Sequence, residues 1–150
     1  MENSKGYIDA LLICKTLGIQ EMVTFCIDTG AHSTCLVERD AIDLGIDLKK
    51  LRKIEKYTAG IGGSADACFL DDVKLGFLDN DGKVWVASFA RVPIIVSRKS
   101  VERKMIDLLL KIIGKSEVET PRGLPSLLGF DFLKGCKISF SEKEAYLDVD

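Results

Sequence analysis

The sequence predicts an all-β (mainly β) fold, and three observations lead to this expectation. Short apolar runs rich in strand-forming residues recur along the chain and are separated by turn residues. The segment Asp79–Gly82 ends in the Asp-Gly pair that tight hairpins favour. Helical spacing of apolar residues is confined to 38–44 and 100–113. We therefore expect a closed or nearly closed β domain of short hairpins, with one short helix and one longer helix.

The first half of the chain is expected to form hairpins around the short helix. The predicted strands are 7–16, 22–28, 34–37 and 67–75. Leu17–Gln20 has the length of a hairpin loop between the first two of these strands. The helix at 38–44 should end at Gly45, because glycine readily adopts the conformation that terminates a helix.

The second half of the chain is expected to add two more hairpins. The predicted strands are 73–78, 84–92, 136–140 and 145–149. Asp79–Gly82 joins the first two of these, and the turn at 141–144 joins the last two. Pro93 should end its strand or place it at a sheet edge, because proline has no N–H to donate.

The longer helix lies in an inserted segment at about 97–120 and has an unusually wide apolar face. Val101, Met105 and Ile112 recur at helical spacing, and Gly114 stands where a C-terminal cap belongs. Such a face either packs on the core of its own chain or contacts a partner. The sequence leaves both alternatives open.

The composition is that of an ordinary globular protein. The chain has 150 residues, so we expect one domain, 1–150. It is 47% hydrophobic and 29% charged, with a formal net charge of −2 and no basic stripe, which argues against a nucleic-acid partner. No apolar run approaches membrane-spanning length, and the polar start at Met1–Ser4 does not resemble a signal peptide.

The cysteines are odd in number and scattered. They are Cys14, Cys26, Cys35, Cys68 and Cys136. A secreted disulfide framework usually has an even count, and zinc sites favour close pairs such as Cys-x-x-Cys. We therefore expect reduced thiols that serve as small core residues in a cytoplasmic protein, and no metal site.

A candidate reactive acid follows the apolar strand at 22–28. This strand runs directly into Asp28-Thr29-Gly30-Ala31, which presents a carboxylate at the tip of a rigid element. Gly30 is expected to adopt a backbone angle that a side chain would forbid. The triplet Asp-Thr-Gly is short, so its meaning depends on the rest of the chain.

Two further stretches follow the acid in order. Ala59-Gly60-Ile61-Gly62-Gly63 is too rich in glycine for the interior of a packed element and reads as a mobile turn between two strands. Leu127-Leu128-Gly129 is an apolar pair followed by glycine, near the end of the chain. The three stretches occur in the order acid turn, glycine-rich turn, apolar pair with glycine.

In this order and on these elements, the three stretches resemble those of retropepsin-like aspartic proteases, the family of retroviral proteases and their cellular relatives. The resemblance covers roughly residues 7–95 and 124–149. It implies the half-barrel of pepsin-like acid proteases, in which Asp28, Thr29, Gly30 and Ala31 form the catalytic loop. Gly60, Ile61, Gly62 and Gly63 would form the flap. Leu127, Leu128 and Gly129 would lie across the catalytic loop, before a short helix at 131–134.

The resemblance also implies an activity. With one Asp-Thr-Gly per chain, a homodimer would bring two Asp28 carboxylates together to activate water against the peptide bonds of extended peptides or unfolded protein. No cofactor or metal takes part in this chemistry. Thr29 would hydrogen-bond across the two-fold axis. The Gly30 carbonyl and the flap tip at Ile61 and Gly62 would bind the backbone of the substrate. Ala31, where pepsin-like enzymes usually have serine, predicts a pH optimum from mildly acidic to near neutral.

The chain departs from the family pattern at two positions. His32 replaces the Asp that usually follows Ala31, and Phe130 replaces the Arg that usually follows Gly129. The family's Arg–Asp interface pair is therefore missing, and the dimer would have to be held in another way. A catalytically silent binding or dimerisation module with the same fold is the alternative function.

Other side chains that suggest chemistry have simpler interpretations. His32 with Cys35 invites thiol or metal chemistry, but no further residue is spaced to complete a triad or a tetrahedral site. Tyr57 is either a flap aromatic or a residue that packs between strands. Asp131 and the pair Asp71-Asp72 are expected to be surface or capping acids.

Overall fold

The computed structural model describes residues 6–51, 55–58, 64–96, 125–140 and 145–149. The expected helix at 100–113, with the whole of the insertion at 97–120, lies outside these ranges. So do the four expected flap residues at 60–63 and the expected hairpin turn at 141–144.

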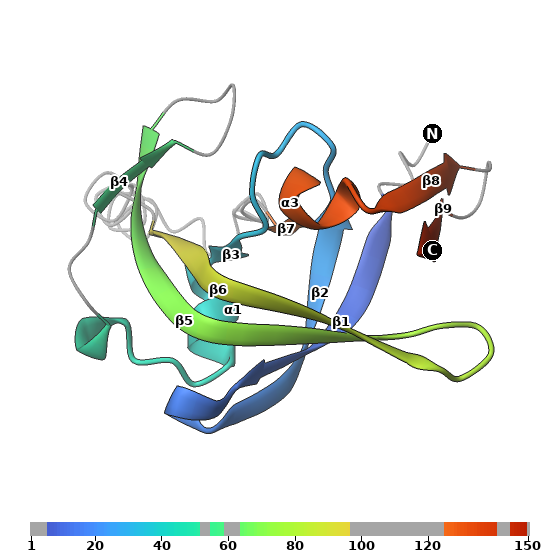
Figure 1. Ribbon diagram of the computed structural model, residues 1–150. Coiled ribbons are helices and arrows are strands. Elements are labelled where there is room, and N and C mark those ends of the chain that lie inside the picture. The colour runs from blue at the N-terminus through green and yellow to red at the C-terminus, as the bar shows by residue number, and fades with distance from the viewer. Residues whose placement is uncertain (1–5, 52–54, 59–63, 97–124, 141–144, 150) are drawn as a thin grey trace, which may run out of the picture.

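One sheet of seven strands forms most of the molecule (Figure 1). Its strands are β1 (Tyr7–Cys14), β2 (Ile19–Ile27), β3 (Leu36–Val37), β4 (Glu55–Thr58), β5 (Ser64–Leu78), β6 (Val84–Val96) and β7 (Ser126–Leu128). The strand order is β3-β6-β5-β1-β2-β7, and β4 pairs with β5 beside this path. The expectation of a mainly β fold is confirmed.

Short helices and a separate hairpin complete the described part of the chain. They are the 3-10 turns η1 (Lys15–Leu17) and η2 (Leu48–Lys50), the helices α1 (Glu38–Asp43) and α3 (Phe130–Leu133), and the strands β8 (Cys136–Phe140) and β9 (Ala145–Val149). β8 and β9 pair with each other in a two-stranded sheet, as expected for the last hairpin.

The two ends of the large sheet meet. Cys35, immediately before β3, forms an antiparallel bridge with Leu127 of β7, the strand at the opposite end of the strand order. The sheet is therefore nearly closed on itself. Its inward face forms the core, which includes Leu12, Phe25, Leu36 and Leu75.

Local sequence explains why the strands begin and end where they do. In β1 the residues Ala10, Leu12 and Cys14 are buried and alternate with more exposed neighbours, which is the period of a half-buried strand. The expected strand at 7–16 ends earlier, at Cys14, because η1 follows and Gly18 makes the turn with φ of 66°.

Two strands extend beyond their predicted limits. Pro93 does not end its strand, because it lies inside β6, opposite Phe69, and the strand continues to Val96. β3 pairs with β6 only from Ile94 onward, so among the described strands Pro93 lies at a sheet edge, which was the other expected alternative and where its missing N–H is tolerated. β5 begins at Ser64 instead of residue 67, because its first residues pair with β4.

All five cysteines are free thiols, and four of them are buried; Cys136 is half-buried. The prediction that cysteines serve as small core residues is therefore confirmed for Cys14, Cys26, Cys35 and Cys68. No helix among the described residues is long and apolar enough to cross a membrane.

The hairpin between β5 and β6 is held by the carboxylate of Asp79. Its Oδ1 accepts hydrogen bonds from the N–H groups of Asp81 (2.9 Å) and Lys83 (2.7 Å). Its Oδ2 accepts one from the indole Nε1 of Trp85 at 3.1 Å. The bonds from the Lys83 N–H and the Trp85 indole are the main reasons why the pKa of Asp79 lies below its ordinary value.

This lowered pKa predicts how stability depends on pH. A carboxyl group with a lower pKa in the folded state stabilises the fold above its unfolded pKa, and this contribution is lost as the pH falls through the folded pKa. Asp79→Ala should therefore lower the free energy of unfolding at about pH 7, and the difference from the unaltered chain should shrink by about pH 3. Urea unfolding followed by Trp85 fluorescence measures both. Asp81→Ala, which removes an exposed carboxylate of the same turn, is the control and should have little effect at either pH.

Candidate active site

Asp28 lies directly after β2, where this strand ends at the loop 28–34 (Figure 1). Its N–H donates to the carbonyl of Leu128 at 3.1 Å, and its carbonyl accepts from the N–H of Ala31 at 3.2 Å. The carboxylate Oδ1 accepts a hydrogen bond from the N–H of Gly30 at 2.9 Å. The loop backbone thus fixes both the main chain and the side chain of Asp28, which is half-buried.

Gly30 is needed for a different reason from the one expected. Its φ is not in the positive region, where the described glycines are Gly18, Gly45 and Gly82, so the predicted special backbone angle is wrong. A Cβ on Gly30 would instead lie 3.2 Å from Oδ1 of Asp28, a tight contact. The glycine therefore gives the carboxylate room to receive its hydrogen bond.

β7 lies between the two ends of the loop. It runs parallel to β2, with Cys26 opposite Leu127 and Ile27 opposite Leu128. On its other side Leu127 exchanges two main-chain hydrogen bonds with Cys35, each 2.9 Å long. Leu127 and Leu128 therefore lie across the loop that carries Asp28, in the position that the resemblance implied.

Gly129 packs directly against the loop. A Cβ on this residue would lie 2.3 Å from the carbonyl carbon of Ser33 and 2.7 Å from the nitrogen of Thr34, distances that real Cβ atoms do not reach. The Gly129 N–H donates to Oγ1 of Thr34 at 3.1 Å. Only glycine allows the chain after β7 to approach the loop this closely.

Asp131 in α3 ties the loop to the end of the chain. Its Oδ1 accepts hydrogen bonds from the N–H of Thr34 (2.8 Å), the hydroxyl of Thr34 (2.7 Å) and the N–H of Phe132 (2.9 Å). Thr34 is 1% exposed, so these bonds satisfy polar groups that water does not reach. Asp131 is exposed, as expected for a surface acid, but α3 has no side-chain cap bond at its N-cap Gly129, and the contacts with Thr34 were not foreseen.

The main chain of α3 adds two further bonds to the loop. The N–H of Phe130 donates to the carbonyl of Ala31 at 2.8 Å, and the N–H of Asp131 donates to the carbonyl of His32 at 3.3 Å. α3 begins at Phe130, one residue before the helix that the resemblance implied. The loop is consequently held by β2, β7 and α3 together.

The tip of the loop faces solvent in the single chain. Thr29, Gly30 and His32 are exposed, whereas Ala31 is buried. Phe130, where the family pattern has Arg, is also exposed, at 52% of its surface. An exposed aromatic side chain therefore follows directly on the segment that crosses the loop.

Cys35 does not have the properties of a nucleophile. Burial, together with the negative charges of Asp131 and Asp28, raises the pKa of its thiol to about 11, although a hydrogen bond with the main chain of Leu127 acts in the opposite direction. Reactive thiols need the opposite, a lowered pKa that favours the thiolate. His32 and Cys35 therefore offer no thiol chemistry, and the described residues contain no cluster of His, Cys, Asp and Glu suited to a metal ion.

The glycine-rich stretch joins two paired strands. β4 and β5 pair up to Thr58 opposite Ser64, so the chain between them leaves one strand of a hairpin and enters the other. Tyr57 of β4 packs edge-on against Phe69 of β5, with ring centroids 6.0 Å apart, which confirms its strand-packing interpretation. Arg91 of β6 lies over the Phe69 ring at 3.3 Å and pairs with Glu55 of β4 at 3.2 Å.

The close packing of Gly129 against the loop predicts a large effect of a small substitution. Gly129→Ala should lower the free energy of unfolding by about 1–3 kcal/mol or more, because the added methyl group meets backbone atoms that have no room to move. Gly135→Ala is a matched control, since its Cβ would meet no atom closer than 3.9 Å. Urea unfolding of both variants measures the difference. Equal stability of the two variants would contradict the described contact.

Likeness to known proteins is found among solved structures. No family model and no curated protein matches the sequence. Among solved structures, the chain is similar to a retropepsin-like aspartic protease from Rickettsia conorii, with 22% sequence identity and a TM-score of 0.45. The match covers 97% of this chain and 92% of that protein.

Proposed function

We propose that the chain is an aspartic endopeptidase that works as a homodimer. The observation that carries this proposal is the setting of Asp28. Its carboxylate is held by the Gly30 N–H on a loop that β2, β7 and α3 fix, while the neighbouring Thr29 and Gly30 face solvent. A carboxylate fixed in this way and accessible at the same time suits acid–base catalysis.

The chemistry needs a second carboxylate. Two carboxylates about 3 Å apart cannot both ionise, so they share one proton and titrate as a pair, the known behaviour of aspartic proteases. The ionised member removes a proton from water, which attacks the peptide carbonyl. The protonated member donates to the carbonyl oxygen and later helps the amine to leave. In this proposal the second carboxylate is Asp28 of another copy.

The exposed surface around Asp28 supports a dimer. Thr29 is exposed beside Asp28 and is available to hydrogen-bond across a two-fold axis. Phe130, 52% exposed, would be covered by the second copy and would contribute apolar burial where the family's Arg–Asp pair is missing. Gly30 would offer its carbonyl to the backbone of a substrate, and Gly60, Ile61, Gly62 and Gly63 would close over it as a flap.

The substrate would be an extended peptide or an unfolded protein, because a flap and a catalytic loop bind main chain much as an added strand does. The five free thiols support a reducing compartment, and we place the enzyme in the cytoplasm on this ground. If the unaltered chain does not cleave protein in the following experiment, the alternative function holds, a catalytically silent binding or dimerisation module.

Replacing the carboxylate should abolish cleavage. Asp28→Asn should lower the rate of cleavage of denatured casein by about a hundredfold to ten-thousandfold, because the amide neither takes nor gives the proton. Gel electrophoresis of the digest measures the rate. Asp81→Asn removes an exposed acid in the β5–β6 turn and should leave the rate unchanged. Equal activity of Asp28→Asn and the unaltered chain would refute the protease proposal.

The proposed dimer is tested separately, with the same protein preparations. Analytical ultracentrifugation should give a mass near twice 16.5 kDa, and specific activity should fall when the protein is diluted below its dimer dissociation constant. A strictly monomeric protein that cleaves casein would contradict the shared pair of carboxylates.

The pH optimum should lie between mildly acidic and near neutral. Ala31 is buried and has no hydroxyl group to donate toward the carboxylate pair, so nothing at this position favours the ionised form. Ala31→Ser should supply such a donor and shift the acid limb of the rate profile to lower pH. The profiles of both proteins with the same peptide measure this shift. A profile of the unaltered chain that peaks near about pH 2 would be inconsistent with the assigned role of Ala31.

A further inference from the structure

β2 is paired on one side along nearly its whole length but on the other side only near its end. β1 pairs with β2 from Ile19 to Cys26. β7 pairs only with Phe25, Cys26 and Ile27. Among the residues that the structure describes, no strand lies beside β2 on the β7 side between Ile19 and Thr24.

The direction of the main-chain groups follows from two hydrogen bonds. The N–H of Ile27 donates toward the β1 side, to the carbonyl of Gly6 at 2.8 Å, whereas the N–H of Asp28 donates toward the β7 side, to Leu128. Successive residues of a strand point their N–H and C=O groups to opposite sides. Gln20 and Met22 therefore direct theirs to the β7 side, beyond the reach of β7. Such unpaired groups form a template for an added strand.

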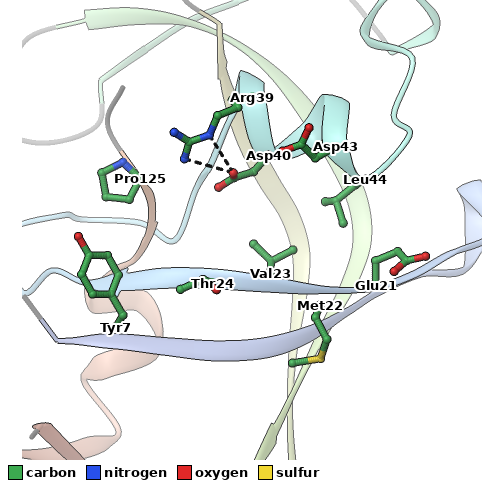
Figure 2. A pocket seen from close by; sticks show the side chains of 10 residues that line it. All are labelled: Tyr7, Glu21, Met22, Val23, Thr24, Arg39, Asp40, Asp43, Leu44 and Pro125. Atoms are coloured by element: carbon green, nitrogen blue, oxygen red, sulfur yellow. Dashed lines mark hydrogen bonds and ion pairs between the residues drawn. The ribbon is translucent and has the colours of Figure 1, made fainter. Parts of the chain in front are cut away.

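A cavity of about 570 Å³ lies along this edge, between β2 and α1. Figure 2 shows Val23 at its floor and Leu44 on the facing wall, with Tyr7 and Pro125 at one end and Glu21 at the other. The cavity is thus elongated along β2 and has an apolar centre. It lies on the flank of β2, whereas Asp28 follows the end of that strand.

The charges around the cavity are unbalanced. Its charged residues are Glu21, Asp40, Asp43 and Arg39. Arg39 pairs with Asp40 at 3.3 Å, and Asp40 also accepts a hydrogen bond from the hydroxyl of Ser126 at 2.6 Å. Glu21 and Asp43 are exposed, and neither forms an ion pair with the residues described. Two carboxylates are therefore available to a cationic partner.

We propose that this edge binds an extended peptide segment of a partner protein that carries an apolar and a basic residue two positions apart, so that both side chains lie on the face of Val23 and Glu21. The segment adds to β2 as a strand, and its main chain bonds to Gln20 and Met22. Its apolar side chains pack on Val23 and Leu44, and its lysine or arginine side chains pair with Glu21 and Asp43. Main-chain hydrogen bonds to the edge of β2 give affinity, and the surplus of carboxylates around the cavity favours basic segments.

The test uses the Asp28→Asn chain, so that no cleavage of the probe interferes and the result does not depend on the proposed protease activity. The probe is a short peptide in which valine and lysine occupy every second position in turn, with threonine between them, acetylated and amidated at its ends. NMR titration should shift the amide signals of Gln20 and Met22 and leave those of the loop 28–34 unchanged. A matching valine–glutamate peptide should bind at least about tenfold more weakly.

Two further experiments separate the contribution of main-chain hydrogen bonds to binding from the contribution of the charged side chains. A probe N-methylated at every residue cannot donate hydrogen bonds from its residues' main-chain nitrogens and should lose binding to the unaltered edge. The double variant Glu21→Lys with Asp43→Lys should weaken binding of the valine–lysine probe by about tenfold or more, with circular dichroism as the check on folding. Shifts confined to the loop 28–34, equal binding of the two peptides, undiminished binding of the N-methylated probe, or no shifts at all would overturn the proposal.

Discussion

The pairing of β7 between β2 and Cys35 is the constraint on which the site depends. β7 brings only Ser126, Leu127 and Leu128, yet it forms a parallel ladder with β2 on one side and a two-bond bridge with Cys35 on the other. The two segments that flank the loop from Asp28 to Thr34 are therefore both bonded to the same strand, β7. A reactive group needs this kind of rigid support to be held in one geometry.

Buried polar groups on both sides of β7 reinforce this arrangement. Ser126, which is fully buried, accepts a hydrogen bond from the N–H of Val37 and donates one to Asp40. Thr34 is bonded to Asp131 and Gly129. An unsatisfied buried polar group would cost about 1–3 kcal/mol, so each bond specifies one position of β7 relative to its neighbours. The short helices α1 and α3 contribute mainly by providing two of these hydrogen-bond partners, Asp40 and Asp131.

β2 has two separate tasks in the proposed functions. Its end presents Asp28 to solvent on a fixed loop, whereas no strand among the described residues pairs with its flank at Gln20 and Met22, beside the cavity next to α1. Asp40 connects the two regions, because it bonds to Ser126 of β7 and to Arg39 at the cavity. The same strand can therefore serve chemistry at one end and partner binding along one side.

The sequence by itself determined the mainly β fold, the hairpins and the turn that carries Asp28, because strand alternation and turn chemistry act over a few residues. It placed Leu127-Leu128-Gly129 against that turn only through a family resemblance. The bond between Thr34 and Asp131 spans 97 residues, and no local pattern signals it. Packing likewise decided that β6 passes through Pro93 and that Gly30 is needed for space near Asp28. These features were decided by the tertiary structure, since each depends on which distant backbone lies within hydrogen-bond or van der Waals distance.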